Sequence, residues 1–336
     1  MDSKNFALDE MAYLLQSGSD RIGALDFQQS AKTYLPRAAD NAPLEELHRA
    51  AEMVQAGVPL TPELAEALLH GTAIGGARPK ALIETPERKY IAKFSASNDT
   101  YSVVGGEFVA MRLASLAGIR TADVRMESAA GRRVILIERF DRQRVAGGWS
   151  RRMMVSALTI LGLDEMLARY ASYADLAEAI RLSFTEPRMT LRELFERMLF
   201  NVLIGNTDDH ARNHAAFWDG QMLSLTPAYD ICPQSRTGGE ASQSMRIAGE
   251  DQSSRLSTCF AAAPVFGLSP TDAREVAERQ METIRASWTA VCDQAAMSVV
   301  DRNFFLGRQV LNPYAFDDLE GGAAPLRRLA EEIRRS

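Results

Sequence analysis

The stretch GNTDDHARNH, residues 205–214, concentrates the reactive side chains of this sequence and holds two of its four histidines. It stands between an apolar run with helical spacing at 190–205 and an alternating hairpin at 214–225. Asp208 and Asn213 lie five residues apart, the D-x-x-x-x-N spacing with which a kinase catalytic loop supplies a carboxylate for the acceptor hydroxyl and an amide oxygen for Mg²⁺. The spacing favours phosphoryl transfer over a merely solvated loop.

A second carboxylate follows the hairpin, Asp230 in LTPAYDI (225–231). Phosphoryl transfer needs a metal ion that bridges phosphate oxygens, and Mg²⁺ prefers a few carboxylate and amide oxygens with waters in the remaining positions. We therefore expect Asn213 and Asp230 to be the Mg²⁺ ligands. An isolated Asp after Tyr is commonly a turn residue, so the weight of Asp230 comes from the order of catalytic loop, hairpin and carboxylate.

The first half of the chain contains a glycine-containing turn at 71–80 that precedes a strand. Gly75 and Gly76 have no Cβ, so their backbone N–H groups could approach phosphate oxygens closely, and Lys80 ends the turn. A glycine pair alone is weak evidence, because ordinary turns use it as well.

The parts that would complete a nucleotide site follow in order. Lys93 lies on the expected strand 89–94 and is a candidate for the phosphates, and Glu107 on the next helix is a candidate for its ion-pair partner. Glu138 to Phe140 ends a β-rich run, where a hinge between lobes would offer backbone groups to adenine. ATP with Mg²⁺ is the cofactor that this set of residues predicts.

The order of elements predicts a two-lobed α/β (α+β) fold similar to that of protein kinases. Strands and helices mix in an expected N-lobe at 1–145, and helices dominate an expected C-lobe at 146–336. The strand expectations are a hairpin at 81–85 and 89–94, a run at 132–140 and a hairpin at 214–225. Helical spacing is read at 43–57, 61–69, 104–116, 150–162, 173–183, 190–205, 270–287 and 323–335.

The amino-acid composition further limits the class of protein to which this sequence can belong. The 336 residues include 38 Lys and Arg against 44 Asp and Glu, a net charge of −6, which gives no reason to expect direct nucleic-acid binding. Three scattered cysteines without CxxC spacing predict buried thiols in a reducing compartment. The N-terminus has no secretory pattern and no segment is apolar enough for a membrane, so we expect a cytoplasmic protein.

The segments GGARPK (75–80), YIAK (90–93), ERFDR (138–142), GNTDDHARNH and LTPAYDI resemble those of HipA-type toxin kinases, the serine/threonine kinases of bacterial toxin–antitoxin modules. The resemblance covers about 18–310. It implies Asp208 as catalytic base, with Asn213 and Asp230 on Mg²⁺. The implied nucleotide contacts are Gly75, Gly76, Lys80, Lys93, Glu138, Phe140, His210, Asn213, Tyr229 and Asp230.

The same resemblance implies a protein substrate, with aminoacyl-tRNA synthetases as the family's target class, and arrest of translation and growth as in persistence. It also implies a HipB-like antitoxin, with a separate small HipS-like protein as a further partner, and contact with DNA only through the antitoxin.

Two departures from the family pattern stand out. Ala73 occupies the position of the serine that HipA kinases usually autophosphorylate, and Thr72 lies beside it. About a hundred residues that HipA proteins carry ahead of the GALDF-like segment are missing, which resembles the short HipT-type toxins and would also fit a truncated chain.

Two other classes remain open at this point. Asp208, Asp209, His210 and His214 could build a metal-dependent hydrolase, because two histidines four apart share a helix face in HExxH zinc sites. However, Ala211 stands where that motif has its glutamate. An ATP-binding pseudokinase or regulatory module is the other alternative, although Lys93, Asp208, Asn213 and Asp230 are all present.

Overall fold

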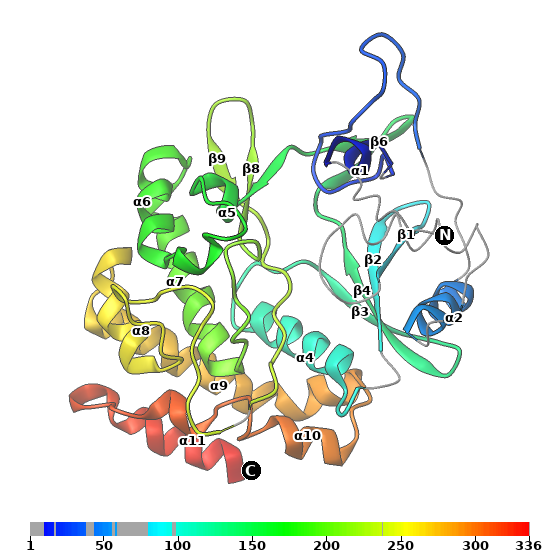
Figure 1. The fold of residues 1–336 in the computed structure, drawn as a ribbon. Helices are drawn as coiled ribbons and strands as arrows, with labels where there is room; N and C mark the ends of the chain where they lie inside the picture. Colours follow the sequence, from blue (N-terminus) through cyan, green and yellow to red (C-terminus); the bar gives the residue numbers. More distant parts are fainter. Residues whose placement is uncertain are drawn as a thin grey trace, which may run out of the picture. The chain divides into compact units, whose positions relative to one another are not determined.

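The computed structural model describes residues 10–16, 18–37, 44–55, 58, 80–95, 99–236 and 238–335 (Figure 1). The chain divides into two compact units. The first comprises 1–98 and 127–153, and the second comprises 99–126 and 154–336. Both helices and sheets are present, which confirms the expected mixed α/β class.

The first unit is built on a four-stranded sheet with the order β1-β2-β4-β3. Strands β1 and β2 form the expected hairpin, and β2 pairs antiparallel with β4. The elements of this part of the chain are α1 (Glu10–Gln16), α2 (Leu44–Gln55), β1 (Lys80–Glu84), β2 (Lys89–Phe94), β3 (Val124–Ala129), β4 (Arg132–Glu138), β5 (Arg142–Val145) and β6 (Gly148–Arg151).

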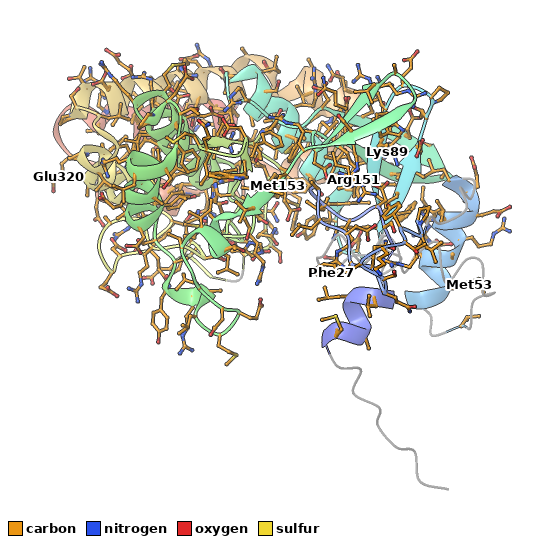
Figure 2. The ribbon with its side chains drawn as sticks, turned by 90° about the horizontal axis from the view of Figure 1, so that it is seen from above. Phe27, Met53, Lys89, Arg151, Met153 and Glu320 are labelled. Atoms are coloured by element: carbon orange, nitrogen blue, oxygen red, sulfur yellow. The ribbon has the colours of Figure 1, made fainter. Side chains whose placement is uncertain are left out.

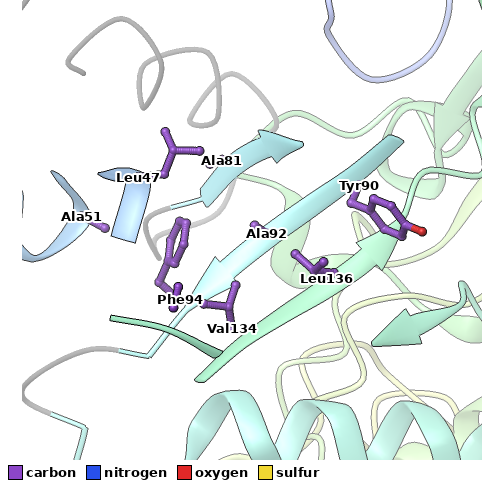
Figure 3. Packing of buried hydrophobic residues seen from close by; sticks show 9 residues of the cluster. Leu47, Ala51, Ala81, Tyr90, Ala92, Phe94, Val134 and Leu136 are labelled. Carbon is purple, nitrogen blue, oxygen red and sulfur yellow. The ribbon is translucent and has the colours of Figure 1, made fainter. Parts of the chain in front are cut away.

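The sheet has an apolar face that packs on α2, as the close view in Figure 3 shows. Because side chains alternate along a strand, Tyr90, Ala92 and Phe94 of β2 share this face. Leu47 and Ala51 lie four residues apart on α2, so both point toward the sheet and are almost completely buried. Burial of this stripe, rather than helix propensity, therefore accounts for where α2 lies.

The second unit is mainly helical. Its elements are α4 (Val103–Leu116), β7 (Met154–Ser156), α5 (Ala157–Ile160), η1 (Ala168–Tyr170), α6 (Tyr173–Ser183), α7 (Pro187–Ile204), β8 (Ala215–Trp218), β9 (Leu223–Leu225), α8 (Leu256–Ala262), η2 (Ala263–Phe266), α9 (Pro270–Gln294), α10 (Val299–Phe305), η3 (Pro313–Phe316), η4 (Gly321–Ala323) and α11 (Pro325–Arg335). Strands β7, β8 and β9 form one antiparallel sheet in that order.

Helix α7 is the central element for the candidate site. Pro187 occupies its first turn, where a missing N–H costs nothing, and Gly205 ends it in the left-handed conformation with φ +74°. Its last three turns are buried on every side, from Leu194 to Ile204. Because neighbouring elements surround this part of α7, they hold its end in place, and that end fixes where the following loop begins.

One predicted helix is wrong. Residues 150–162 are not a single helix: 148–151 pair with β5, 154–156 pair with β8, and only the short α5 follows. Strand β6 forms a hairpin with the adjacent β5, and β7 pairs with β8, which lies much further along the chain; helical periodicity reveals neither pairing. The predicted helix at 61–69 lies outside the described residues. The other predicted helices are present with ends shifted by at most three residues, except that α9 continues to Gln294, seven residues beyond its predicted end.

The expected lobes at 1–145 and 146–336 remain a prediction about nucleotide binding. The compact units differ from them in two respects: 99–126 lies in the second unit, where α4 packs against α9, and 146–153, which includes β6, lies in the first unit. Cys232, Cys259 and Cys292 are free and buried, as expected for structural thiols. Among the residues with described structure, no helix combines the length and the apolar character needed to cross a membrane.

Candidate active site

The loop after α7 is closed by hydrogen bonds within itself. Asn213 donates from Nδ2 to the carbonyl oxygen of Asp208 over 3.1 Å, and the backbone N–H of Asn213 donates to His210 O over 2.8 Å. The two residues that the spacing singled out are thus brought together. The amide nitrogen is engaged by a carbonyl, so Oδ1, the amide atom suited to bind a hard cation, is not used by this bond.

Asp230 reaches the same region on a strained backbone. Its φ of +60° lies in the left-handed region, where Asp is tolerated at a cost and where functional residues are over-represented. The hydroxyl of the preceding Tyr229 donates to Arg212 O over 2.7 Å. This hydrogen bond joins the PAYD segment to the catalytic loop, on the side next to Asn213.

The approach to Asp230 is held by backbone pairing. Thr226 N donates to Ala215 O over 3.0 Å, and Ala228 N donates to Arg120 O over 2.7 Å. The buried guanidinium of Arg197, on α7, donates to Thr226 O over 2.6 Å. Helix α7 therefore positions both sides of the site: its end begins the catalytic loop, and its side holds the segment that leads to Asp230.

The electrostatics of the site place excess negative charge around Asp208. Its side chain reaches solvent, yet its pKa is raised, first by desolvation and then by the negative charges of Asp230 and Asp209, while His210 and Arg212 oppose the shift. A carboxylate with a raised pKa is a better proton acceptor when ionised. A divalent cation would offset the repulsion between the carboxylates of Asp208 and Asp230, so these residues fit Mg²⁺.

The adjacent carboxylate, Asp209, has a different environment. It is 3% exposed, it accepts a hydrogen bond from the Tyr173 hydroxyl, and its Oδ1 lies 3.0 Å from Nε2 of His214. Burial opposes its ionisation, but the charge of His214 and hydrogen bonds from His214, Tyr173 and Asn201 hold its pKa below the usual value. The sequence did not single out Tyr173, because nothing in its local pattern distinguishes it from a core tyrosine.

This geometry overturns the zinc interpretation. Residues 206–214 form turns rather than a helix, so His210 and His214 do not share a helix face. His214 is 3% exposed and directed at Asp209. Across the described ranges, no three His, Cys, Asp or Glu side chains are grouped as a metal-binding cluster.

In the first unit, the strand register brings two of the predicted residues together. Lys80 and Lys93 are direct cross-strand partners, 8% and 7% exposed, so their side chains leave the sheet on the same face, opposite to the face that packs on α2. The site residues Gly75 and Gly76 lie outside the described residues.

The ERFDR segment shows where the other predicted residues of the first unit lie. Glu138 ends β4 and accepts from Arg88, and Phe140 follows the buried Arg139. Glu107 is buried on α4 and thus belongs to the second unit, whereas Lys93 belongs to the first. The hinge and the ion pair stay predictions.

The fold, together with the arrangement of the 205–214 loop, is that of the kinase-like class. The family described as "HipA-like C-terminal domain" matches residues 72–288, which is more than half of the chain. The chain belongs to this family, which confirms the resemblance first seen in the motifs.

Two curated relatives carry kinase names. The chain is 31% identical over 147 residues to "Putative kinase Y4mE" of Sinorhizobium fredii, and 26% identical over 147 residues to the serine/threonine-protein kinase toxin HipA of Shewanella oneidensis. These alignments cover 42% and 39% of the chain. They span only about a third of each relative, 33% and 34%.

Solved structures support the fold over a larger part of the chain. The HipA, HipB and operator DNA complex of Shewanella oneidensis matches with a TM-score of 0.66 at 18% identity, covering 93% of this chain and 74% of the other. The proinflammatory kinase CtkA of Helicobacter pylori matches with a TM-score of 0.54 at 15% identity, covering 78% of this chain and 94% of the other.

Proposed function

We propose that this protein is an ATP-dependent serine/threonine protein kinase that acts as the toxin of a toxin–antitoxin module. The observation that carries the proposal lies in the loop that follows α7 in the second unit. There Asn213 donates to Asp208 O, and the pKa of the Asp208 carboxylate is raised by burial and by the charge of Asp230. Membership of the HipA-like family and the kinase names of its relatives support the same class of reaction.

The proposed roles follow from the chemistry of each group. Asp208 accepts or orients the proton of the acceptor hydroxyl as that oxygen attacks the γ-phosphorus of ATP. Asn213 Oδ1 and the carboxylate of Asp230 hold Mg²⁺, which offsets phosphate charge when bound. His210 and Tyr229 line the nucleotide site from the same loop region.

The first unit supplies the remaining nucleotide contacts in this proposal. Lys93 and Lys80 offset charge on the phosphates, and as cross-strand partners on β2 and β1 they lie on the same face of the sheet. Gly75 and Gly76 approach the phosphates through their backbone N–H groups, and Glu138 to Phe140 form the hinge.

The proposed substrate is a serine or threonine of a protein, with an aminoacyl-tRNA synthetase as the target class, and its phosphorylation arrests translation and growth. A HipB-like antitoxin is the proposed partner, with a HipS-like small protein in addition, and DNA is reached through the antitoxin. The structural relative from Shewanella oneidensis is HipA in complex with HipB and operator DNA, and its likeness in fold supports this type of assembly.

The test is transfer of label from γ-labelled ATP with Mg²⁺ into a lysate of cells that lack this protein. Wild-type protein is compared with Asp208→Ala and with Asp208→Asn, which keeps the side-chain volume and removes the charge. We expect a labelled protein band with the wild type and a loss of at least 100-fold with both variants, while ATP binding measured by calorimetry stays within about threefold.

Mass spectrometry of the band then identifies the acceptor and shows whether the modified residue is Ser or Thr. Full transfer by Asp208→Ala would contradict the catalytic assignment. Tight ATP binding without any transfer would indicate the nucleotide-binding regulator instead, and absence of ATP binding would overturn the kinase proposal.

A further inference from the structure

The loop between α7 and β8 is closed by two contacts, an outer one and an inner one. In the outer contact, Asn213, which is 7% exposed, donates from Nδ2 to Asp208 O over 3.1 Å. In the inner contact, Nε2 of His214 lies 3.0 Å from Oδ1 of Asp209. Asp209 follows Asp208 and His214 follows Asn213, so each residue of the inner contact is covalently adjacent to one residue of the outer contact.

The inner contact is part of a wholly buried polar group. Asp209, His214, Tyr173 and Asn201 are 3%, 3%, 1% and 3% exposed. The Tyr173 hydroxyl donates to Oδ2 of Asp209, and the Tyr173 ring meets the His214 ring edge-on at 5.6 Å between centroids. Both carboxylate oxygens of Asp209 are thus engaged, which leaves this carboxylate unable to serve as the catalytic base.

The partners of Asp209 come from elements that are fixed independently. Tyr173 is the first residue of α6, whose start is capped by Ser172 and tied to Arg246 O by the backbone N–H of Tyr173 over 3.0 Å. Asn201 lies in the last turns of α7, and its Oδ1 accepts from Asn206 Nδ2 over 2.9 Å. The buried group therefore links the loop to both α6 and α7.

We propose that Asp209, with His214 and Tyr173, is a positioning unit that sets the relative placement of Asp208 and Asn213 for phosphoryl transfer. This inference rests on the proposed kinase function. In-line transfer is sensitive to displacements of about 1 Å, so a loop that loses its interior closure loses rate even if it still binds nucleotide. A buried carboxylate persists only when it is paired, and the Tyr173 hydroxyl and the His214 ring are the partners that Asp209 has here.

The experiment measures the initial rate of label transfer into the same lysate at varied ATP concentration. Asp209→Asn removes the charge at constant volume, and it should lower the apparent kcat at least tenfold while the KM for ATP stays within about twofold. Tyr173→Phe removes only the hydroxyl donor and should lower kcat about threefold or more.

Two substitutions of His214 separate positioning from packing. His214→Gln keeps a donor for Asp209, whereas His214→Phe keeps the aromatic contact with Tyr173 and loses the donor. If the contact with Asp209 positions the loop, the Gln variant retains several times more activity than the Phe variant. The opposite order would indicate a packing role and overturn the inference.

The matched control is Gln280→Leu, because Gln280 is also fully buried and its Nε2 donates to Glu196 O over 2.8 Å on the side of α7 that packs on α9. We expect this variant to lose thermal stability without the fall in kcat per folded molecule. Wild-type kcat in Asp209→Asn would contradict the inference while the kinase function stands. If Asp209→Asn does not fold, unchanged kcat in Tyr173→Phe contradicts it in the same way. An inactive wild type would instead count against the proposed function itself.

Discussion

We predict that one isosteric change, Asp141→Asn, strongly destabilises the first unit, because Asp141 lies in a heavily charged buried cluster. Asp141 is 2% exposed and bridges two buried guanidiniums: Arg139 donates to both of its oxygens over 3.0 and 2.8 Å, and Arg142 donates to Oδ2 over 2.8 Å. Oδ2 also accepts the backbone N–H of Gly23 over 2.8 Å. Asp141 therefore fastens the segment around Gly23 to the end of β4.

The magnitude follows from what the substitution leaves behind. The side chains of Arg139 and Arg142 are 0% and 1% exposed, so without Asp141 these two buried positive charges would share, among the described residues, the carboxylate of Asp20, which is 26% exposed. Lys89, labelled in Figure 2, also pairs with Asp20 over 2.8 Å. Removing one partner from a buried pair costs about 3–5 kcal/mol.

Hydrogen exchange read by mass spectrometry provides the assay, because a protein with two units need not unfold in one step. Peptides from 18–37 and from β2 should lose about 3–5 kcal/mol of protection, which corresponds to exchange roughly 100- to 5,000-fold faster. The control is Glu52→Gln, which breaks the half-exposed pair with Arg132 and should cost less than about 1 kcal/mol. An Asp141→Asn effect no larger than that of Glu52→Gln would show that the buried charges do not hold this segment.

Two further predictions concern backbone conformation and pH. Gly205→Ala should cost about 2–4 kcal/mol of unfolding free energy, because φ is +74° and a Cβ there would collide with Gln309 O. The control Gly162→Ala, with φ +66° and open space around it, should cost only about 1 kcal/mol. Equal losses of stability in urea unfolding would contradict the collision. His48 is fully buried against Phe94, and burial lowers its pKa below 6.5, so the unfolded state takes up a proton first as pH falls. Protection of β2 against hydrogen exchange, corrected for intrinsic rates, should therefore decline below about pH 6.5 in the wild type and decline less in His48→Leu; an identical decline in both would exclude His48 as the cause.

Much of the fold could be predicted because its signals are local. The alternation at 89–94 and the helical spacing at 173–183 and 270–287 each reflect one element burying one face, and the structure has β2, α6 and α9 there. The prediction of a helix at 150–162 is wrong because residues of this run pair with strands β5 and β8. The sequence of a strand does not by itself determine which other strand it pairs with.

The candidate site divides in the same way. The residue types present and their order can be read from the sequence: a carboxylate and an amide five apart, a hairpin, and a second carboxylate in LTPAYDI. That order suffices for a hypothesis of phosphoryl transfer, because it depends only on spacing along one chain.

The environments of the two neighbouring carboxylates are set only in the folded chain. The D-x-x-x-x-N spacing selects Asp208 in the sequence, but it does not reveal that Tyr173 of α6 and His214, just before β8, contact Asp209. Folding also places Lys80 opposite Lys93, since register depends on how two strands pair. Burial and hydrogen-bond partners come from residues far apart in the chain, so these assignments exist only once the chain has folded.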